Sequence, residues 1–302
     1  MLQKRSEGEH GHVPVLLNEV LGYLNLSAGK TILDATIGYA GHASKILELI
    51  SPNGFLIGID KDIEALNIAK NNLSAFDGKY VLLKDDFRNL ERDLSQLNIN
   101  KLDGILFDLG VSSLQLEKPE RGFSIRYDGP LDMRMDASSQ RRARDLVNSC
   151  SFDELVAILK EFGEEPKAKS IARLIIEHRK KIPLTTTRGL RDLVEKAYHY
   201  KRYKIHPATK TFQAFRIAVN DELESLKSGL EKIVKFMAPA SRLCVISFHS
   251  LEDRIVKNYF KKLAISGVAK IITKKPVTPS KEEMENNPRS RSAKLRVIEK
   301  VN

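Results

Sequence analysis

The stretch TILDATIGYAGHASKILELISPNGFLIGID, residues 31–60, decides the fold because it reads as strand, glycine-bearing turn, helix, strand and acidic residue. Two glycines, Gly38 and Gly41, follow the first apolar run. Glycine in such a turn lets the backbone adopt positive φ and pass close to a ligand. Asp60 lies 19 residues after Gly41, about where a doubly wound fold places the carboxylate that binds ribose hydroxyls. The stretch therefore predicts a βαβ unit that binds a nucleotide-type cofactor.

The glycine pattern departs from the dinucleotide fingerprint GxGxxG. Gly38 and Gly41 have the spacing of its last two glycines, but Thr36 occupies the place of the first. A diphosphate ligand is therefore less favoured than a ligand with adenosine and no diphosphate. S-adenosylmethionine is the commonest cofactor of that kind. An ordinary βαβ unit without a ligand stays open as an alternative at this point.

The composition predicts a folded protein with a substantial core. The chain has 302 residues, enough for about two domains, and 42% of them are apolar. No apolar run approaches the ~18 residues of a membrane span, and the first residues do not resemble a signal peptide, so we expect a cytoplasmic protein with no membrane partner. Its two cysteines, Cys150 and Cys244, form no CxxC or Cys/His cluster, so neither disulfides nor a metal site is expected.

The positive charge is concentrated in one segment. The formal net charge is +11, and residues 166–210 carry 13 Lys/Arg against three acidic residues, a balance of +10. Such a block predicts a polyanionic partner, most plausibly nucleic acid. Lys180, Lys181, Lys201 and Arg202 are the predicted phosphate contacts. A solvated basic face is the alternative that charge alone leaves open.

Strands and helices alternate through the first half of the chain. We expect strands at 30–34, 55–60, 80–84 and 102–108, and helices at 14–24, 42–50, 62–73 and 89–97. Alternation of this kind implies a parallel sheet covered on both faces. The strands read as near-continuous apolar runs, which agrees with burial on both sides.

The pattern changes after the fourth strand. Residues 110–139 are loop-like, and helical periodicity follows from 144 to about 196, with Ser151 as a plausible N-cap. The pattern then predicts a helix at 221–237, a strand at 242–248, a helix at 251–262, and strands at 269–273 and 294–301. The predicted architecture is an α/β domain, residues 1–110 and 211–302, interrupted by a basic, all-helical insertion, residues 111–210.

Ligands of doubly wound sheets bind outside the carboxyl ends of the strands. Asp108 ends the fourth strand and is a candidate for the centre of the site, although a carboxylate that caps a turn would look the same. Phe87 follows the third strand, where an aromatic ring could lie against an adenine or pack in the core. Gln213 and Arg216, three apart in a predicted helix that Thr209 would cap, could read a substrate.

The segment SFHSLEDR, residues 247–254, follows a predicted strand. Ser247, His249 and Ser250 would project toward the site, but a turn held by the Ser and His side chains is the simpler interpretation. A serine hydrolase is disfavoured because the chain contains no GxSxG nucleophile elbow.

Eight motifs in order resemble one family, the bacterial 16S ribosomal RNA cytosine-N4 methyltransferases, which depend on S-adenosylmethionine. They are HVPVLLNEVL at His12, DATIGYAGH at Asp34, DGILFDLGVSS at Asp103, RGFSIRYDGPLDMRMD at Arg121, GEEPKAKSIARLI at Gly163, HPATKTFQAFRIAVNDEL at His206, ISFHSLEDRIVK at Ile246 and NPRSRSAKLRVIE at Asn287. The resemblance spans nearly the whole chain.

The resemblance implies a Rossmann-like class I methyltransferase sheet with a helical insertion, acting on a cytidine in the decoding centre of 16S rRNA in the small ribosomal subunit. Family cofactor contacts fall on Ala40, Gly41, His42, Asp60, Phe87, Asp108 and Gln115. The turn departs from the family pattern, because Tyr39 and Ala40 stand where Arg-Gly is more usual.

The chemistry of the cytosine amine sets what the site must provide. Its lone pair is delocalised into the ring, so transfer requires in-line placement and acceptors for the amine hydrogens. Amino-methyltransferases commonly use a (D/N/S)PP(Y/F) loop after the fourth strand, whereas this chain reads DLGVSS there. Asp108 and Ser112 are the candidate acceptors. A nicotinamide-dependent dehydrogenase and a non-enzymatic RNA-binding assembly factor are the competing hypotheses.

Overall fold

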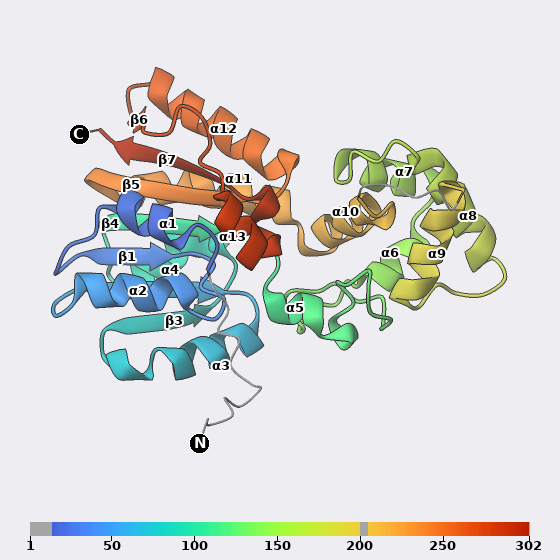
Figure 1. Ribbon diagram of the computed structural model, residues 1–302, viewed down its shortest axis with the longest axis horizontal. Coiled ribbons are helices and arrows are strands. Elements are labelled where there is room, and N and C mark those ends of the chain that lie inside the picture. The colour runs from blue at the N-terminus through green and yellow to red at the C-terminus, as the bar shows by residue number, and fades with distance from the viewer. Residues whose placement is uncertain (1–13, 200–204, 302) are drawn as a thin grey trace. The chain divides into compact units, whose positions relative to one another are not determined.

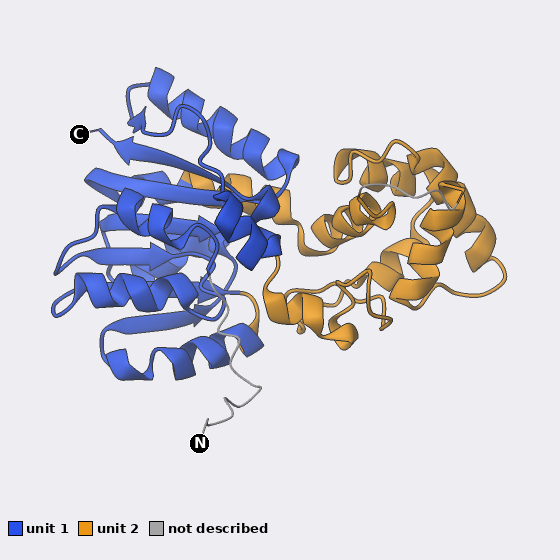
Figure 2. Ribbon diagram, in the orientation of Figure 1, with its two compact units in different colours: residues 1–60, 64–109, 232–302 blue, residues 61–63, 110–231 orange. Residues whose placement is uncertain are grey.

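A computed structural model describes residues 14–199 and 205–301 (Figure 1). The sequence predictions at His12, Lys201 and Arg202 lie outside these ranges. The chain divides into two compact units, coloured separately in Figure 2. Unit 1 comprises the described residues up to Asp60, residues 64–109 and residues from 232 on, and unit 2 comprises residues 61–63 and 110–231.

Unit 1 is built on one sheet, whose seven strands in the described part of the chain have the order β3-β2-β1-β4-β5-β7-β6. Strands β1 to β5 pair in parallel, and β7 pairs antiparallel with β5 and β6. The bounds are β1 Thr31–Asp34, β2 Phe55–Asp60, β3 Tyr80–Lys84, β4 Leu102–Asp108, β5 Met237–Ser247, β6 Ala269–Ile271 and β7 Lys294–Lys300. The predicted Rossmann-like α/β sheet is therefore confirmed.

The sheet is covered on both faces. Ile105, Leu106 and Phe107 follow one another in β4 and all have 0% exposure, although successive side chains of a strand point to opposite faces. Leu106 packs in the core beneath α1 and α2, two helices that contact each other and lie in front of the sheet in Figure 1. The described helices of unit 1 are α1 Leu17–Leu24, α2 Gly41–Ile50, nearly all of α3 Ile63–Asn72, α4 Leu90–Gln96, α12 Ser250–Ile265 and α13 Lys281–Asn286.

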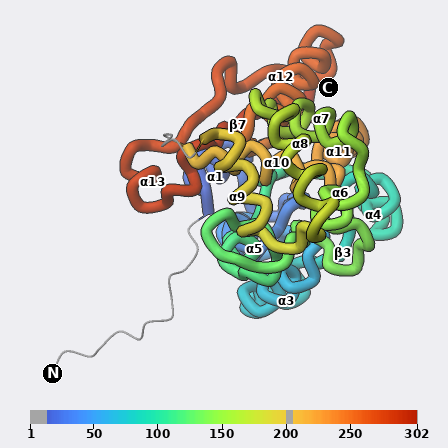
Figure 3. Tube along the Cα trace, turned by 90° about the vertical axis from the view of Figure 1, so that its right-hand side faces the viewer, coloured from blue at the N-terminus to red at the C-terminus, as the bar shows by residue number. Residues whose placement is uncertain are grey.

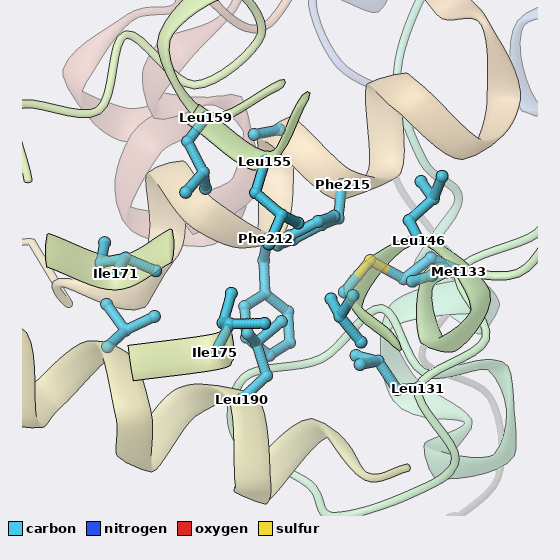
Figure 4. Packing of buried hydrophobic residues seen from close by; sticks show 14 of the residues in the cluster. Leu131, Met133, Leu146, Leu155, Leu159, Ile171, Ile175, Leu190, Phe212 and Phe215 are labelled. Carbon is cyan, nitrogen blue, oxygen red and sulfur yellow. The ribbon is translucent and has the colours of Figure 1, made fainter. Parts of the chain in front are cut away.

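Unit 2 is helical and has a core of its own. Its helices are α5 Ser113–Glu117, α6 Ala143–Ser149, α7 Phe152–Glu161, α8 Ala168–Arg179, α9 Thr187–Ala197, α10 Ala208–Asn220 and most of α11 Glu222–Ile233. Helix α10 contacts α6, α7 and α9, and these helices gather together in Figure 3. Its Phe212 and Phe215 lie among Leu155, Ile175 and Leu190 in Figure 4.

The helical core of unit 2 extends further along the chain than the predicted end of the insertion. The sequence places the end of the insertion at residue 210, whereas the structure groups residues up to 231 with unit 2. The reason is that α10 turns an apolar face, including Phe212 and Phe215, into the insertion's core. A short segment after β2, Lys61–Ile63, also groups with unit 2, and no sequence pattern predicts this.

Most predicted elements are confirmed to within a few residues, with three corrections. The loop predicted at 110–139 contains helix α5 and a 3-10 turn, Pro119–Arg121. The helix predicted at 221–237 stops earlier, because β5 already begins at Met237. Thr209 is not an N-cap, since α10 begins at Ala208, but Ser151 does cap α7 by accepting a hydrogen bond from the Glu154 amide. Within the described residues, no helix combines the length and the apolar character needed to span a membrane.

Candidate cofactor and catalytic site

The turn between β1 and α2 has an unusual backbone. Ala40 takes the left-handed conformation, with φ +65°, directly before α2 begins at Gly41. Left-handed backbone costs a residue with a side chain about 1–2 kcal/mol, so this position favours glycine. Gly41 must stay without a side chain for another reason, because a Cβ there would lie 2.6 Å from Pro14 Cγ. The left-handed backbone at Ala40 is thus a strain in the turn.

Asp60 holds this turn against the end of β2. Its Oδ2 accepts a hydrogen bond from the Gly38 amide at 3.0 Å, and Gly38 also has a positive φ of 50°. The side chain is partly exposed, and one carboxylate oxygen fixes the turn. The structure places Asp60 beside the glycine turn, and its role as a ribose ligand stays a prediction.

Thr36 joins the ends of β1 and β4. Its hydroxyl accepts a hydrogen bond from the Asp108 amide at 2.6 Å, and its own amide donates to Asp34 Oδ1 at 3.2 Å. A glycine at this position, as in a dinucleotide fingerprint, could not make the first contact. Thr36, which stands in place of the first glycine of the fingerprint, therefore has a structural role of its own.

Asp34, the first residue of the motif DATIGYAGH, ends β1 and is buried. It is 2% exposed, and burial raises its pKa to about 7, with a smaller contribution from the nearby charge of Asp60. An acidic residue that ends a buried apolar strand, directly before a glycine turn, is the feature that could have identified it.

Asp108 lies beside Asp34 at the end of β4 and carries an unpaired acceptor. Its Oδ1 is buried and has no hydrogen-bond partner in the described part of the chain. Its Oδ2 lies 3.6 Å from His42 Nδ1, while His42 Nε2 donates to the Val15 carbonyl at 3.0 Å. Burial raises the pKa of Asp108 well above its ordinary value, and the charges of Asp34 and Glu252 raise it further. The arrangement is a carboxylate poised to accept a proton or a hydrogen bond.

His249 and Glu252 begin α12 after β5. They form a capping box, in which His249 Nδ1 accepts from the Glu252 amide at 3.4 Å and Glu252 Oε2 accepts from the His249 amide at 3.3 Å. Ser247 is buried, and its hydroxyl donates to the Lys294 carbonyl at 3.4 Å. The interpretation of this segment as a turn held by Ser and His side chains is confirmed.

Phe87 is buried and packs edge to face on Phe107 of β4, with ring centroids 5.3 Å apart. It begins the 3-10 turn Phe87–Asn89, which Asp86 caps by accepting from the Arg88 amide. Core packing, one of the two roles that the sequence left open for Phe87, is therefore present. Contact with an adenine stays a prediction.

Ser112 and Gln115 lie in unit 2 and hold each other. The Ser112 hydroxyl caps α5 by accepting from the Gln115 amide, and Gln115 Oε1 accepts from the Ser112 amide at 3.1 Å. Gln115 Nε2 donates to Asp62 Oδ2 at 2.8 Å, and Arg121 pairs with the same oxygen at 2.9 Å. Both side chains thus have structural partners. Gln115 as a cofactor contact and Ser112 as an acceptor for the cytosine amine stay predictions.

Arg121 completes a paired, buried network in unit 2. Besides Asp62, its guanidinium donates to the carbonyls of Arg134 and Met135 at 3.0 and 2.9 Å. Arg121 is 9% exposed, Asp62 3% and Gln115 4%. This network explains why the segment directly after Asp60 groups with unit 2, and the sequence offers no periodicity or motif spacing that could predict it.

The predicted substrate readers of α10 are engaged within unit 2. Gln213 Nε2 donates to the Phe162 carbonyl, and Arg216 forms two 2.8 Å hydrogen bonds with the Glu222 carboxylate. Both side chains have partners within unit 2, and a role for Gln213 and Arg216 in reading a substrate stays a prediction.

The basic block of unit 2 lies on the surface. Lys169 and Arg173 are exposed on α8, four residues apart and hence on one face, and Lys180 is exposed where the helix ends. The opposite face of α8 is buried through Ile171 and Ile175. We call Lys169, Arg173 and Lys180 the α8 basic stripe.

Residues 9–301 match the model of the MraW methylase family. The chain belongs to the MraW methylase family. Curated relatives of this MraW methylase are named "Ribosomal RNA small subunit methyltransferase H". The relative from Caldicellulosiruptor saccharolyticus is 49% identical over 305 residues, covering 96% of this chain and 99% of the relative. That from Clostridioides difficile is 44% identical over 310 residues, covering 97% and 100%.

Among solved structures, this MraW methylase is similar to a putative methyltransferase from Streptococcus mutans in complex with SAH. The identity is 11% and the TM-score 0.48, over 96% of this chain and 100% of the other. The family match covers the described residues of both units, so the helical insertion belongs to the MraW pattern as much as the sheet does. The family resemblance stated from the eight motifs is confirmed.

Proposed function

We propose that this protein transfers a methyl group from S-adenosylmethionine to the N4 amine of a cytidine in the decoding centre of 16S rRNA, in the cytoplasm. The names of its relatives support a small-subunit rRNA substrate. The observation that carries the proposal within the molecule is Asp108, a buried carboxylate with an unpaired oxygen at the end of β4.

The residues present fit this cofactor. S-adenosylmethionine carries cationic sulfonium and ammonium groups, and the strand ends of unit 1 supply carboxylates at Asp34, Asp60 and Asp108. A cation placed beside Asp108 would offset the charge repulsion and burial that raise its pKa. By contrast, the turn lacks the first glycine of a diphosphate site, and Thr36 fills that place with a needed hydroxyl.

When bound, S-adenosylmethionine supplies the methyl group: the N4 lone pair bonds to the methyl carbon, and the carbon–sulfur bond breaks with its electron pair left on sulfur. Asp108 accepts a hydrogen bond from the N4 amine, which orients the lone pair, and then takes the proton that the methylated amine must lose. Burial and the charges of Asp34 and Glu252 raise the pKa of Asp108, and a raised pKa makes the ionised carboxylate a stronger base.

Neighbouring side chains of unit 1 prepare Asp108 for proton transfer. The Thr36 hydroxyl fixes the Asp108 backbone, and His42 lies on the side of Oδ2, so Oδ1 is the free acceptor. His42 is itself oriented by the Val15 carbonyl. Glu252 and Asp34 keep Asp108 basic through their charge.

Unit 2 supplies the surface for the RNA. The α8 basic stripe offers exposed cations for phosphates, and phosphate contacts provide the salt-dependent part of RNA affinity. The target base must leave its stack to reach a protein site, so we expect it to be flipped out or already splayed.

The test is incubation of the purified protein with labelled S-adenosylmethionine and either naked 16S rRNA or small ribosomal subunits, followed by nucleoside analysis. We expect N4-methylcytidine at one position. Binding of RNA and cofactor without transfer would support an assembly factor instead, and a different methylated nucleoside would refute the proposed reaction.

A further inference from the structure

The side chain of His249 holds a second unpaired polar atom in unit 1. It is nine-tenths buried, and its Nδ1 accepts a hydrogen bond from the Glu252 amide. An Nδ1 that accepts carries no proton, so the ring proton of the neutral imidazole is on Nε2. Nε2 lies 3.2 Å from Glu252 Oε1 but makes no hydrogen bond within the described residues. His249 therefore presents a buried N–H that makes no hydrogen bond, with a Glu252 carboxylate oxygen nearby.

This donor and the unpaired acceptor of Asp108 belong to the ends of two neighbouring strands. Strands β4 and β5 are parallel neighbours, with Asp108 opposite Ile246, and the Leu109 amide donates to the Ile246 carbonyl at 3.0 Å. His249 follows Ile246 by three residues, where β5 has ended. Glu252, the partner of His249 in the capping box, is close enough to Asp108 for its charge to be felt there.

A buried donor and a buried acceptor left unpaired at neighbouring strand ends require an explanation. Each such group costs about 1–3 kcal/mol when it lacks a partner. A ligand that presents an acceptor beside a donor would satisfy both. The Watson–Crick edge of cytosine does so, with N3 as acceptor and the N4 amine as donor, whereas uracil presents the reverse pair.

We propose that His249 and Asp108 together read the Watson–Crick edge of the target cytosine, with His249 Nε2–H donating to N3 and Asp108 Oδ1 accepting from the N4 amine. This inference rests on the proposed function and adds a specificity-determining residue to it. The two contacts hold N4 in place for transfer and reject uracil, which would set donor against donor and acceptor against acceptor. Rejection of this kind is strong, because it leaves buried polar groups unpaired.

A purely structural role for His249 makes a different prediction, and two variants separate the two roles. His249→Asn keeps an acceptor at the Nδ1 position, and Asn is a good N-cap, so α12 should be preserved while the donor to N3 is lost. His249→Gln places an amide N–H near the Nε2 position and weakens the cap. Base reading therefore predicts that Gln retains more activity than Asn, and capping predicts the opposite order.

The decisive experiment uses small subunits reconstituted with 16S rRNA that carries either cytidine or 3-deazacytidine at the methylated position. 3-Deazacytidine keeps the N4 amine and replaces N3 by C–H. Replacing cytidine by the analogue lowers kcat/KM in both proteins. We expect this decrease to be roughly 10- to 100-fold larger for the wild type than for His249→Asn. Any change in the reactivity of the amine itself is common to both proteins and cancels in this comparison.

The outcomes separate this inference from the proposed function. If wild type methylates cytidine but His249→Asn loses as much on the analogue as wild type does, His249 does not contact N3 and the inference is overturned. If wild type transfers no methyl group to cytidine, the proposed function itself fails. Calorimetry with S-adenosylmethionine and thermal unfolding of each variant show whether cofactor binding and folding are intact, as we expect for His249→Asn.

Discussion

Two buried polar clusters, one in each unit, use similar residue types in opposite ways. The strand-end cluster of unit 1 consists of Asp34, Asp108, His249 and Glu252, and it leaves Asp108 Oδ1 and His249 Nε2 without hydrogen bonds. The Arg121 cluster of unit 2 consists of Arg121, Asp62 and Gln115, whose polar groups meet one another or backbone carbonyls. From this difference we infer that the paired cluster stabilises the fold, and we propose that the unpaired cluster binds a ligand.

The physical basis of the comparison is the cost of an unsatisfied group. A buried charge with a partner and full hydrogen bonding is roughly neutral for stability, whereas removal of its partner costs several kcal/mol. A buried carboxylate without a cation raises its pKa instead, as Asp34 and Asp108 do. Substitutions should therefore affect turnover in the first cluster and stability in the second.

The largest expected effect is on catalysis, from Asp108→Asn. An amide of the same shape cannot take a proton, so we expect kcat to fall about 10²- to 10⁴-fold. The free energy of unfolding should stay unchanged or increase, because a buried carboxylate that resists ionisation is removed. Single-turnover methyl transfer and urea unfolding measure the two quantities. Full turnover in a protein that binds cofactor normally would exclude Asp108 as the proton acceptor.

Arg121→Met should mainly reduce stability. It leaves Asp62 buried without its cation, and breaking a buried pair in this way costs about 3–5 kcal/mol. Denaturant unfolding is the measurement, and Arg126→Met is the matched control, since Arg126 is exposed. Addition of Asp62→Asn to Arg121→Met should recover part of the loss. A decrease as small as that of the control would mean that the network does not hold unit 2 together.

The pH dependence of the free energy of unfolding should reveal the raised pKa of Asp34. Its folded pKa of about 7 lies above the ordinary value of 3.8, so its favourable contribution is complete below pH 3.8 and is lost as the pH rises through 7. Between pH 5.5 and 7.5 the wild type should lose about 2 kcal/mol of unfolding free energy relative to Asp34→Asn. Parallel pH curves for the two proteins would show that Asp34 ionises normally in the folded state.

Charge reversal in the α8 basic stripe should weaken RNA binding, and we expect this effect to be smaller than the three effects above. Lys169→Glu with Arg173→Glu removes two exposed cations, so the slope of log affinity against log salt should decrease by about 2, and cofactor affinity should not change. Lys70→Glu with Lys79→Glu, two exposed cations of unit 1, is the matched control. An equal effect of both pairs would assign the binding to overall charge and not to unit 2.

The smallest expected effect is at the turn of unit 1. Ala40→Gly relieves left-handed backbone worth about 1–2 kcal/mol but adds about 0.5–1 kcal/mol of unfolded-state entropy, so a net gain of about 0.5 kcal/mol is expected. The control Ala43→Gly, inside α2, should instead lose about 1 kcal/mol. Thermal unfolding separates the two. A loss at both positions would mean that Ala40 is not strained.

Periodicity and turn chemistry were sufficient to predict the sheet. The strand bounds of β2, β3 and β4 follow from apolar runs that end in a polar residue, and Ser151 is readable as a cap because its contact is local. The end of the insertion was missed because an amphipathic helix such as α10 shows which face is apolar but not which core that face enters. The grouping of Lys61–Ile63 depends on a contact between residues 59 positions apart, Asp62 and Arg121.

The candidate site was predictable only in part, for the same reason. Asp60 and Asp108 are found because each ends an apolar strand. The free atoms of Asp108 and His249 depend on which neighbours use the other hydrogen-bonding positions, and the sequence does not contain that information. The same limit applies to Arg216, whose partner Glu222 lies across the end of α10.

The most direct test of the account compares Asp108→Asn and Arg121→Met in one assay, methyl transfer to small subunits with saturating S-adenosylmethionine at a temperature where both variants are folded. We predict that Asp108→Asn transfers at most one-hundredth as fast as wild type while unfolding at the same or higher denaturant concentration, and that Arg121→Met turns over within about tenfold of wild type while unfolding earlier. The reverse pattern, with Asp108→Asn active and destabilised, would contradict the claim that the unpaired cluster of unit 1 carries the chemistry.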